Sequence, residues 1–182
     1  MMGLESRMFF SSAIGARSGD DRTDFASQIC VFLPSTPNPT VLASLEKLNK
    51  DKQRLTRDLA SLSHAQRATL QADEQAIRAA VDVHKSIVMP LQNRLRSNLN
   101  VWRKKIAQAG EQEDNELKAS GLAAIAADRA AIDAIIDADV RVISARAQLS
   151  AHLPSIAADQ ATIKADTAAL VADMLAELTS LI

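Results

Sequence analysis

Residues 41–62 read VLASLEKLNKDKQRLTRDLASL, with leucines at steps of three, four or seven residues and charged side chains between them. The same spacing continues as far as Ile106, with a single step of eight residues after Leu62. Apolar residues three or four apart share one face of an α-helix, whereas a strand would need alternation. Residues 41–109 hold no glycine and one proline, Pro90. The pattern therefore predicts a long amphipathic helix with one apolar seam.

A polar, acidic stretch follows this segment at residues 111–116, between Gly110 and Gly121, and predicts a turn near 110–121. A second periodic segment then runs to the C-terminus, and the midpoint of residues 41–182 falls beside Gly110. We therefore expect an all-α fold, a long kinked antiparallel helical hairpin that is coiled-coil-like. The expected seam residues are Leu42, Leu45, Leu48, Leu55, Leu59, Leu62, Leu70, Ile77, Val81, Val88, Leu91, Leu95, Leu99, Trp102 and Ile106 on the first arm, and Leu117, Ile125, Ile132, Ile136, Ile143, Ala147, Ile156, Ile163, Leu170, Met174, Leu178 and Leu181 on the second.

Two prolines leave two shapes open for this hairpin. Pro90 and Pro154 cannot donate a backbone hydrogen bond, so inside a helix they kink it or end it. If both prolines kink, the first arm is about 100 Å long, at about 1.5 Å per residue. If both are turns, with Ser155 as a new N-cap, the alternative is an unequal up-down helical bundle. We favour the kinked hairpin.

The two periodic segments carry opposite charge. Residues 41–109 hold thirteen Lys and Arg against six Asp and Glu, a net charge of +7, whereas residues 110–182 hold five against twelve, a net charge of −7. Such segments pair with each other better than with copies of themselves. Asp159, Asp166 and Asp173 repeat at intervals of seven, and we expect them on the wet face of the second arm. A basic stripe on the first arm is expected to face solvent or to pair with Asp166 and Asp173: Lys47, Lys50, Arg54 and Arg57.

Residues 1–40 differ from the rest of the chain. They hold all four phenylalanines and three of the five prolines, and they show no helical period. We interpret them as a flexible N-terminal arm and a Pro-rich linker, in which residues 28–33 are a candidate short strand or docking segment. Asn38 and Pro39 are expected at the N-cap and the first position of the first long helix.

The single cysteine, Cys30, favours a reducing, cytoplasmic compartment, and no apolar run reaches the roughly 18 residues of a membrane span. Residues 7–16 have some features of a targeting segment, but their apolar run is short and broken by serines. An N-terminal targeting segment is therefore the alternative.

No pattern in the chain indicates an active site. His64, His84 and His152 stand alone, so the spacing predicts no metal site. The sequence has neither a glycine-rich phosphate-binding loop nor a nucleophile elbow. We expect no catalytic residues, no cofactor, no metal, no small-molecule substrate and no enzymatic activity.

One segment is a candidate interaction site, because it is a basic amphipathic helix with the only tryptophan. Such helices bind membrane surfaces, protein grooves or nucleic acid. The simpler interpretation is that Trp102 packs in the seam while the cations offset the acidic turn and the helix dipole. The acidic second arm disfavours nucleic acid as a partner. The candidate residues are Arg94, Arg96, Trp102, Arg103, Lys104 and Lys105.

The function expected from these features is that of a non-enzymatic structural or interaction coiled-coil module. It would present an elongated helical surface to a protein partner or to a second copy of itself. Apolar residues off the main stripe, at Val83, Ile87, Ile135 and Val142, support a contact surface. The alternative is a reversible amphipathic-helix protein that binds lipid or a membrane surface.

Overall fold

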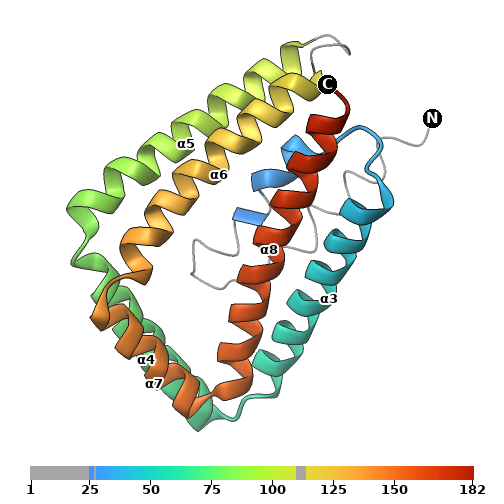
Figure 1. Cartoon of the computed structure of the whole chain (residues 1–182). Coiled ribbons are helices and arrows are strands. Elements are labelled where there is room, and N and C mark those ends of the chain that lie inside the picture. Colours follow the sequence, from blue (N-terminus) through green and yellow to red (C-terminus); the bar gives the residue numbers. More distant parts are fainter. Residues whose placement is uncertain (1–24, 27, 110–113) are drawn as a thin grey trace.

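A computed structural model of the chain describes residues 25–26, 28–109 and 114–182, and within these residues it contains helices and no strand (Figure 1). The predicted all-α fold is confirmed. We call helices α3 to α5 the outgoing arm and α6 to α8 the return arm. The elements are η1 (Cys30–Phe32), α3 (Pro39–Ser61), α4 (His64–Asp82), α5 (Lys85–Gln108), α6 (Asp114–Asp137), α7 (Val140–His152) and α8 (Pro154–Ser180).

The two arms pair along their whole described length. Helix α3 packs on α8, α4 on α7 and α5 on α6, which is the pairing of an antiparallel hairpin. The ends are level, because the Asn38 backbone N–H donates to Glu177 Oε1 at 2.7 Å. The hairpin is nevertheless not a straight rod. It bends at two corners, so that α6 also packs on α8 (Figure 1).

Pro90 does not mark a corner. It lies inside α5, and the break in the outgoing arm comes earlier, at Val83 and His84. Pro90 and Ser86 are both exposed, so solvent reaches the Ser86 carbonyl that loses its N–H donor to the proline ring. The alternative in which Pro90 is a turn is therefore wrong, since the break comes six residues earlier, at His84.

Pro154 does begin a new helix. It occupies the first position of α8, where its missing N–H costs nothing, and Leu153 rather than Ser155 is the N-cap. Across the same corner α4 begins with a capping box, in which Ser63 and Gln66 exchange hydrogen bonds. The eight-residue step after Leu62 marks this break, because a new helix need not keep the phase of the old one.

The outgoing arm takes the longer path around this corner. Arg54 faces Asp159 at 2.5 Å, and Asp73 faces His152 at 3.0 Å. The two contacts are 19 residues apart along the outgoing arm, from Arg54 to Asp73, and 7 residues apart along the return arm. The two arms therefore bend together at this corner, with the outgoing arm on the outer side and the return arm on the inner side.

The second corner shifts the apolar seam of the return arm. Asp139 is the N-cap of α7, and its carboxylate accepts from the backbone N–H groups of Arg141 and Val142. After this restart the buried residues of α7 are Val142, Ala145 and Leu149. The predicted seam residues Ile143 and Ala147 are exposed. The prediction assumed one continuous helix across Asp139, whereas α7 is a new helix whose buried face starts at a different position.

Apart from this stretch, the predicted seam is largely the observed core. Leu42 and Leu181 are about half exposed, at 48% and 54%. The other predicted residues of the outgoing arm are buried or pack against the core, with Val41 buried in place of Leu42. In the return arm the buried predicted residues are Ile125, Ile132, Ile136, Ile156, Ile163, Leu170, Met174 and Leu178.

Carboxylates of α8 lie in the α3–α8 seam and not on its wet face. Asp159 and Asp166 are buried, and they accept from Arg54 at 2.5 Å and Lys47 at 2.6 Å. Ser44 Oγ donates to Asp173 at 2.5 Å. The predicted pairing of the basic stripe with the return helix is thus observed for Lys47. The predicted exposure of the aspartates is wrong, because the apolar residues beside them pack this face of α8 against α3.

Among the described residues of the first forty, four belong to the core, namely Phe25, Ala26, Ile29 and Phe32. Residues 28–29 are helical and continue into η1, so the candidate strand at 28–33 is not formed. Ile29 and Phe32 are fully buried, with η1 against α6. The linker that follows is non-helical, and Asn38 caps α3 as predicted by accepting from the Val41 N–H at 2.9 Å. Residues 1–24 lie outside the described part.

The turn between the arms is shorter than the predicted 110–121. Helix α5 ends at Gln108 and α6 begins at Asp114, so Gly121 is a helical residue. Lys118, one turn after Asp114, is buried and forms an ion pair with it, which anchors the first turn of α6. Residues 110–113 are outside the described part.

The burial of Phe32 yields the first prediction. Phe32→Ala should lower the free energy of unfolding by about 3–5 kcal/mol, because it removes a fully buried ring. Urea denaturation followed by circular dichroism measures the loss. Leu42→Ala, at a half-exposed position of α3, is the control and should cost far less. Equal small losses would show that the segment before the linker does not pack as described.

Candidate functional site

The predicted interaction residue Trp102 packs in the seam near the tip of the hairpin. It is half-buried against Gly121 of α6, where a Cβ atom would lie 3.0 Å from the indole ring and 2.7 Å from Cε1 of Phe32. Lys105 covers the indole, with its Nζ 4.6 Å from the ring centroid. Glycine is required here because two large rings approach the helix backbone. The contacts match the simpler interpretation of Trp102 as a seam residue.

The cations of the same segment do not converge on one site. Arg94 reaches across to Asp128 of α6 at 2.6 Å, and Asn98 donates to the same carboxylate at 2.7 Å. Arg96, Arg103 and Lys104 are exposed on α5. The structure therefore divides the predicted cluster into an inter-arm contact, a covered tryptophan and three exposed cations.

The bend of the hairpin forms a partly open cavity of about 910 Å³, and many of its lining residues are also exposed to solvent. All six long helices contribute to its lining, together with Phe25, and most of its surface is apolar. Six alanines of α6 and α8 line it, and their small side chains leave the space that larger residues would fill. A cavity of about 300–1,000 Å³ with apolar walls and a few polar groups is the usual form of a small-molecule site.

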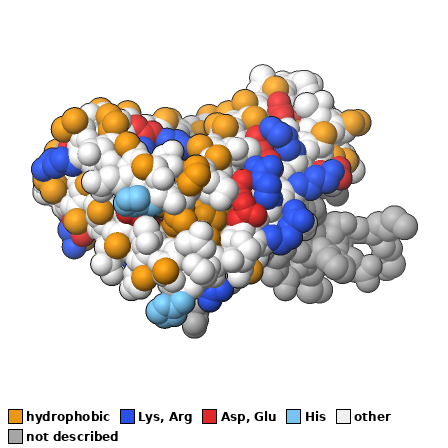
Figure 2. All heavy atoms as spheres, turned by 90° about the horizontal axis from the view of Figure 1, so that it is seen from below, with side chains coloured by type: hydrophobic (Ala, Val, Ile, Leu, Met, Phe, Trp, Pro, Cys, Tyr) orange, Lys and Arg blue, Asp and Glu red, His pale blue; other side chains and the backbone are white. Residues whose placement is uncertain are grey.

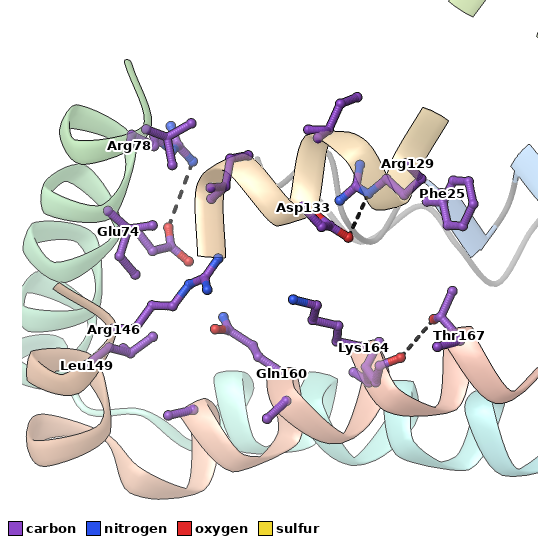
Figure 3. A pocket seen from close by; sticks show the side chains of 18 of the residues that line it. Phe25, Glu74, Arg78, Arg129, Asp133, Arg146, Leu149, Gln160, Lys164 and Thr167 are labelled. Carbon is purple, nitrogen blue, oxygen red and sulfur yellow. Dashed lines mark hydrogen bonds and ion pairs between the residues drawn. The ribbon is translucent and has the colours of Figure 1, made fainter. Parts of the chain in front are cut away.

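Charged side chains of several helices line this cavity; one cluster lies where α6, α7 and α8 meet, and Glu74 and Arg78 of α4 form a separate pair (Figure 3). Arg146 Nη1 donates to Asp137 Oδ1 at 2.6 Å, and Lys164 forms an ion pair with the same carboxylate. Arg129 lies 3.4 Å from Asp133 and 5.6 Å from the Phe25 ring centroid.

Two polar atoms of this cluster are buried without a hydrogen-bond partner, Asp133 Oδ1 and Arg146 Nη2. Burial pushes the pKa of Asp137 upward, but hydrogen bonds from Lys164 and Arg146 outweigh it, and the pKa lies below its usual range. Asp137 is therefore a stable anion that holds two cations in place. Asp137 itself is not among the residues that line the cavity, whereas Arg146 and Lys164 are.

The charged side chains of the lining could bind an anion. Five cationic side chains and three carboxylates of the described residues line the cavity, so its lining carries a net charge of +2. The cationic residues are Arg78, Lys85, Arg129, Arg146 and Lys164. In the described part of the chain, no group of three His, Cys, Asp or Glu side chains is arranged to hold a metal ion. Across the same residues, no helix has both the length and the apolar character that crossing a membrane demands.

Sequence reasoning did not single out this cluster. A signal was present, since Arg129 and Asp133 are four residues apart and, with Asp128, interrupt an apolar run of α6. Charged residues of the return arm at such spacing share a face. What the sequence lacked was the bend, which brings Arg146 of α7 and Lys164 of α8 to the same carboxylate.

A second candidate surface lies on the corner where the arms restart. We call Val83, Ile87, Val140 and Ile143 the apolar corner. Their exposed fractions are 56%, 54%, 73% and 52%. His84 Nε2 lies 2.6 Å from Asp139 Oδ2, which ties the two arms together at this point. Of the four apolar residues predicted off the main stripe, Val83 and Ile87 are exposed, Ile135 is partly buried and Val142 is fully buried.

Comparison of the chain with protein-family models, with curated proteins and with solved structures finds no match.

The packing around Gly121 yields the second prediction. Gly121→Leu should lower the free energy of unfolding by about 1–3 kcal/mol, because its side chain must displace Phe32 or Trp102. Ala123→Leu, at an exposed position of the same helix, is the matched control and should change stability by less than about 0.5 kcal/mol. Denaturant unfolding with tryptophan fluorescence measures both. Similar values for the two variants would contradict the packing of Trp102 on α6.

The low pKa of Asp137 yields the third prediction. Asp137→Asn should destabilise the protein at pH 7 by about 1 kcal/mol, since Arg146 and Lys164 lose their shared anion. A carboxylate with a depressed folded pKa contributes stability that is full above the unfolded pKa, about 3.9, and is lost as the pH falls through the folded value. The difference from wild type should therefore shrink below about pH 4. Urea titrations from pH 7 to pH 3 measure it.

A difference that stays constant over this range would show that the carboxylate charge is not what stabilises the cluster. Asp82→Asn, at an exposed carboxylate of α4, is the control. It should have little effect at either pH.

Proposed function

We propose that this protein is a non-enzymatic helical interaction module that binds another protein, in the first instance a second copy of itself, through the apolar corner. The observation that carries the proposal is the exposure of all four large apolar side chains of the corner, each by more than half. Single exposed apolar residues are ordinary, whereas a group of them marks a contact surface.

The corner is built so that it stays exposed. Val88, Ile136 and Val142, which flank it in the sequence, are buried in the seam and hold the helices in place. The same helices must then present their remaining apolar residues outward. Apolar side chains gather on the left of Figure 2, the side on which α4 and α7 lie in Figure 1. Charged side chains of both signs form a band on the other side.

A second copy is a suitable partner for this surface. Asp82, Lys85 and Arg141 lie beside the apolar corner and are exposed, so its rim holds both signs of charge. A two-fold interface brings each patch onto its own copy, and a rim with both signs can pair with itself. Most of the favourable energy would come from the apolar centre.

The fourth prediction tests this proposal. The double variant Val140→Glu, Ile143→Glu should abolish self-association, because it puts four carboxylates into the centre of a two-fold contact. Both positions lie in the first turn of α7, where acidic residues suit the helix dipole, so the fold should survive. Size-exclusion chromatography with light scattering measures the mass. The wild-type mass should rise from monomer to dimer through the micromolar range.

The control variant is Ala123→Glu, Ala127→Glu, which adds the same charge to an exposed face of α6. It should dimerise as the wild type does. A wild-type chain that stays monomeric at every concentration would exclude a second copy as the partner, and a charge variant of the corner that still dimerises would exclude this surface.

The second candidate function is reversible binding to a membrane surface. It is favoured by the three exposed cations Arg96, Arg103 and Lys104 on one helix. It requires the hairpin to open, and the inter-arm contacts of Arg94, Arg54 and Lys47 oppose opening. The interaction module is therefore the better supported proposal.

A further inference from the structure

We infer that the cavity inside the bend is a binding site for a single-chain carboxylate with a long alkyl tail, a fatty-acid anion. None of the four residues of the apolar corner lines the cavity, although Asp82 and Lys85 of its rim do. It rests on the volume of the cavity, the chemistry of its walls and the position of its cations.

The walls suit an alkyl chain. Ile77 and Val81 of α4, Val88 of α5, Ile132 of α6 and Ile163 of α8 all line the cavity. Between them the alanines of α6 and α8 leave room, and the total of about 910 Å³ lies at the upper end of small-ligand sites, about 300–1,000 Å³. Binding of a hydrocarbon chain in an apolar cavity of this size lowers the free energy, because each methylene group is transferred out of water.

The polar end of the site is formed by α7 and α8. Figure 3 shows the side chains of Arg146, Gln160 and Lys164 pointing into the space between α6 and α8. Arg146 Nη2 is buried and has no acceptor, although Nη1 of the same guanidinium is bound to Asp137. Because Nη2 has almost no accessible surface, a ligand carboxylate would reach it only after a shift of the guanidinium, whereas the more exposed Lys164 could donate a charge-assisted hydrogen bond directly.

The charge balance favours a monoanion. The three carboxylates of the lining offset part of the cationic charge and leave +2. Asp133 forms an ion pair with Arg129 on α6, whereas Arg146 and Lys164 project from α7 and α8. A single carboxylate can sit beside these two cations, and Asp137 holds them in position without lining the cavity. The preformed arrangement reduces the entropy that binding must otherwise spend on ordering the side chains.

Isothermal titration calorimetry on the full chain tests the inference, with decanoate, dodecanoate and tetradecanoate below their micelle concentrations. We expect saturable binding of one anion per chain, tightened about tenfold by each added pair of methylenes. Dodecanol, with the same chain and no charge, should bind at least tenfold more weakly than dodecanoate.

Two variants locate the ligand. Ala161→Phe fills the cavity from α8 and should abolish binding, whereas Ala165→Phe, on an exposed part of the same helix, should leave it unchanged. Lys164→Gln should weaken dodecanoate about tenfold or more without affecting dodecanol. Lys104→Gln, at an exposed cation outside the cavity, is its control. Circular dichroism melting confirms that each variant is folded.

Several results would overturn the inference. These are an absence of saturable binding, equal binding of dodecanol, or unchanged dodecanoate binding in folded Ala161→Phe or Lys164→Gln. Titration with anionic phospholipid vesicles separates a surface from a cavity. Vesicle binding by both wild type and Ala161→Phe, without binding of the monomeric anions, would assign lipid affinity to the membrane-surface alternative instead.

Discussion

The structure depends on the burial of α8 between other helices. This helix packs on α3, α6 and α7, and it carries the largest set of buried residues of any helix in the described part of the chain. Ile156, Ile163, Leu170, Met174 and Leu178 form its apolar stripe. Alanines fill many of the positions between, so neighbouring backbones can approach closely. Because one helix must serve three neighbours, the hairpin cannot remain a straight double rod, and α6 folds back onto α8.

Carboxylates in the α3–α8 seam then set the register of the arms. Asp159 and Asp166 are buried, and each keeps one side-chain oxygen without a hydrogen-bond partner. The neighbouring Asp166 carboxyl is the main cause that raises the pKa of Asp51, whereas burial pushes the pKa of Asp166 upward but interactions with Lys47 and Asp51 hold it below its usual range. Since the side chains of Lys47 and Arg54 are 65% and 46% exposed, these pairs add little net stability. A sliding of α3 along α8 would nevertheless leave buried carboxylates unpaired, which is costly.

Both candidate surfaces follow from the same bend. On its inner side the alanines and isoleucines of α6 and α8 face a space that no further helix of the described residues fills, and this space is the cavity. At the second corner, where both arms restart, the helices present apolar residues that their own seam cannot cover. His84 and Asp139, which meet there, connect the two arms and so hold the corner in shape. A change that straightened the hairpin would therefore remove the cavity and rearrange the apolar corner together.

The sequence by itself determined the helical class, the seam of the outgoing arm, the N-cap at Asn38 and the opposite charge of the two arms, because periodicity, capping and charge act over a few residues or over a whole segment. A step of eight marks the corner at Leu62, but the sequence prediction continued one helix through it. Tertiary structure alone decided the break at His84 and Asp139, the burial of Phe32 and the meeting of Arg146 with Lys164. Ending a helix at His84 or Asp139 costs only a few backbone hydrogen bonds, and the periodicity of the sequence does not reveal so small a local cost. The burial that compensates for it comes from contacts between residues far apart in the chain.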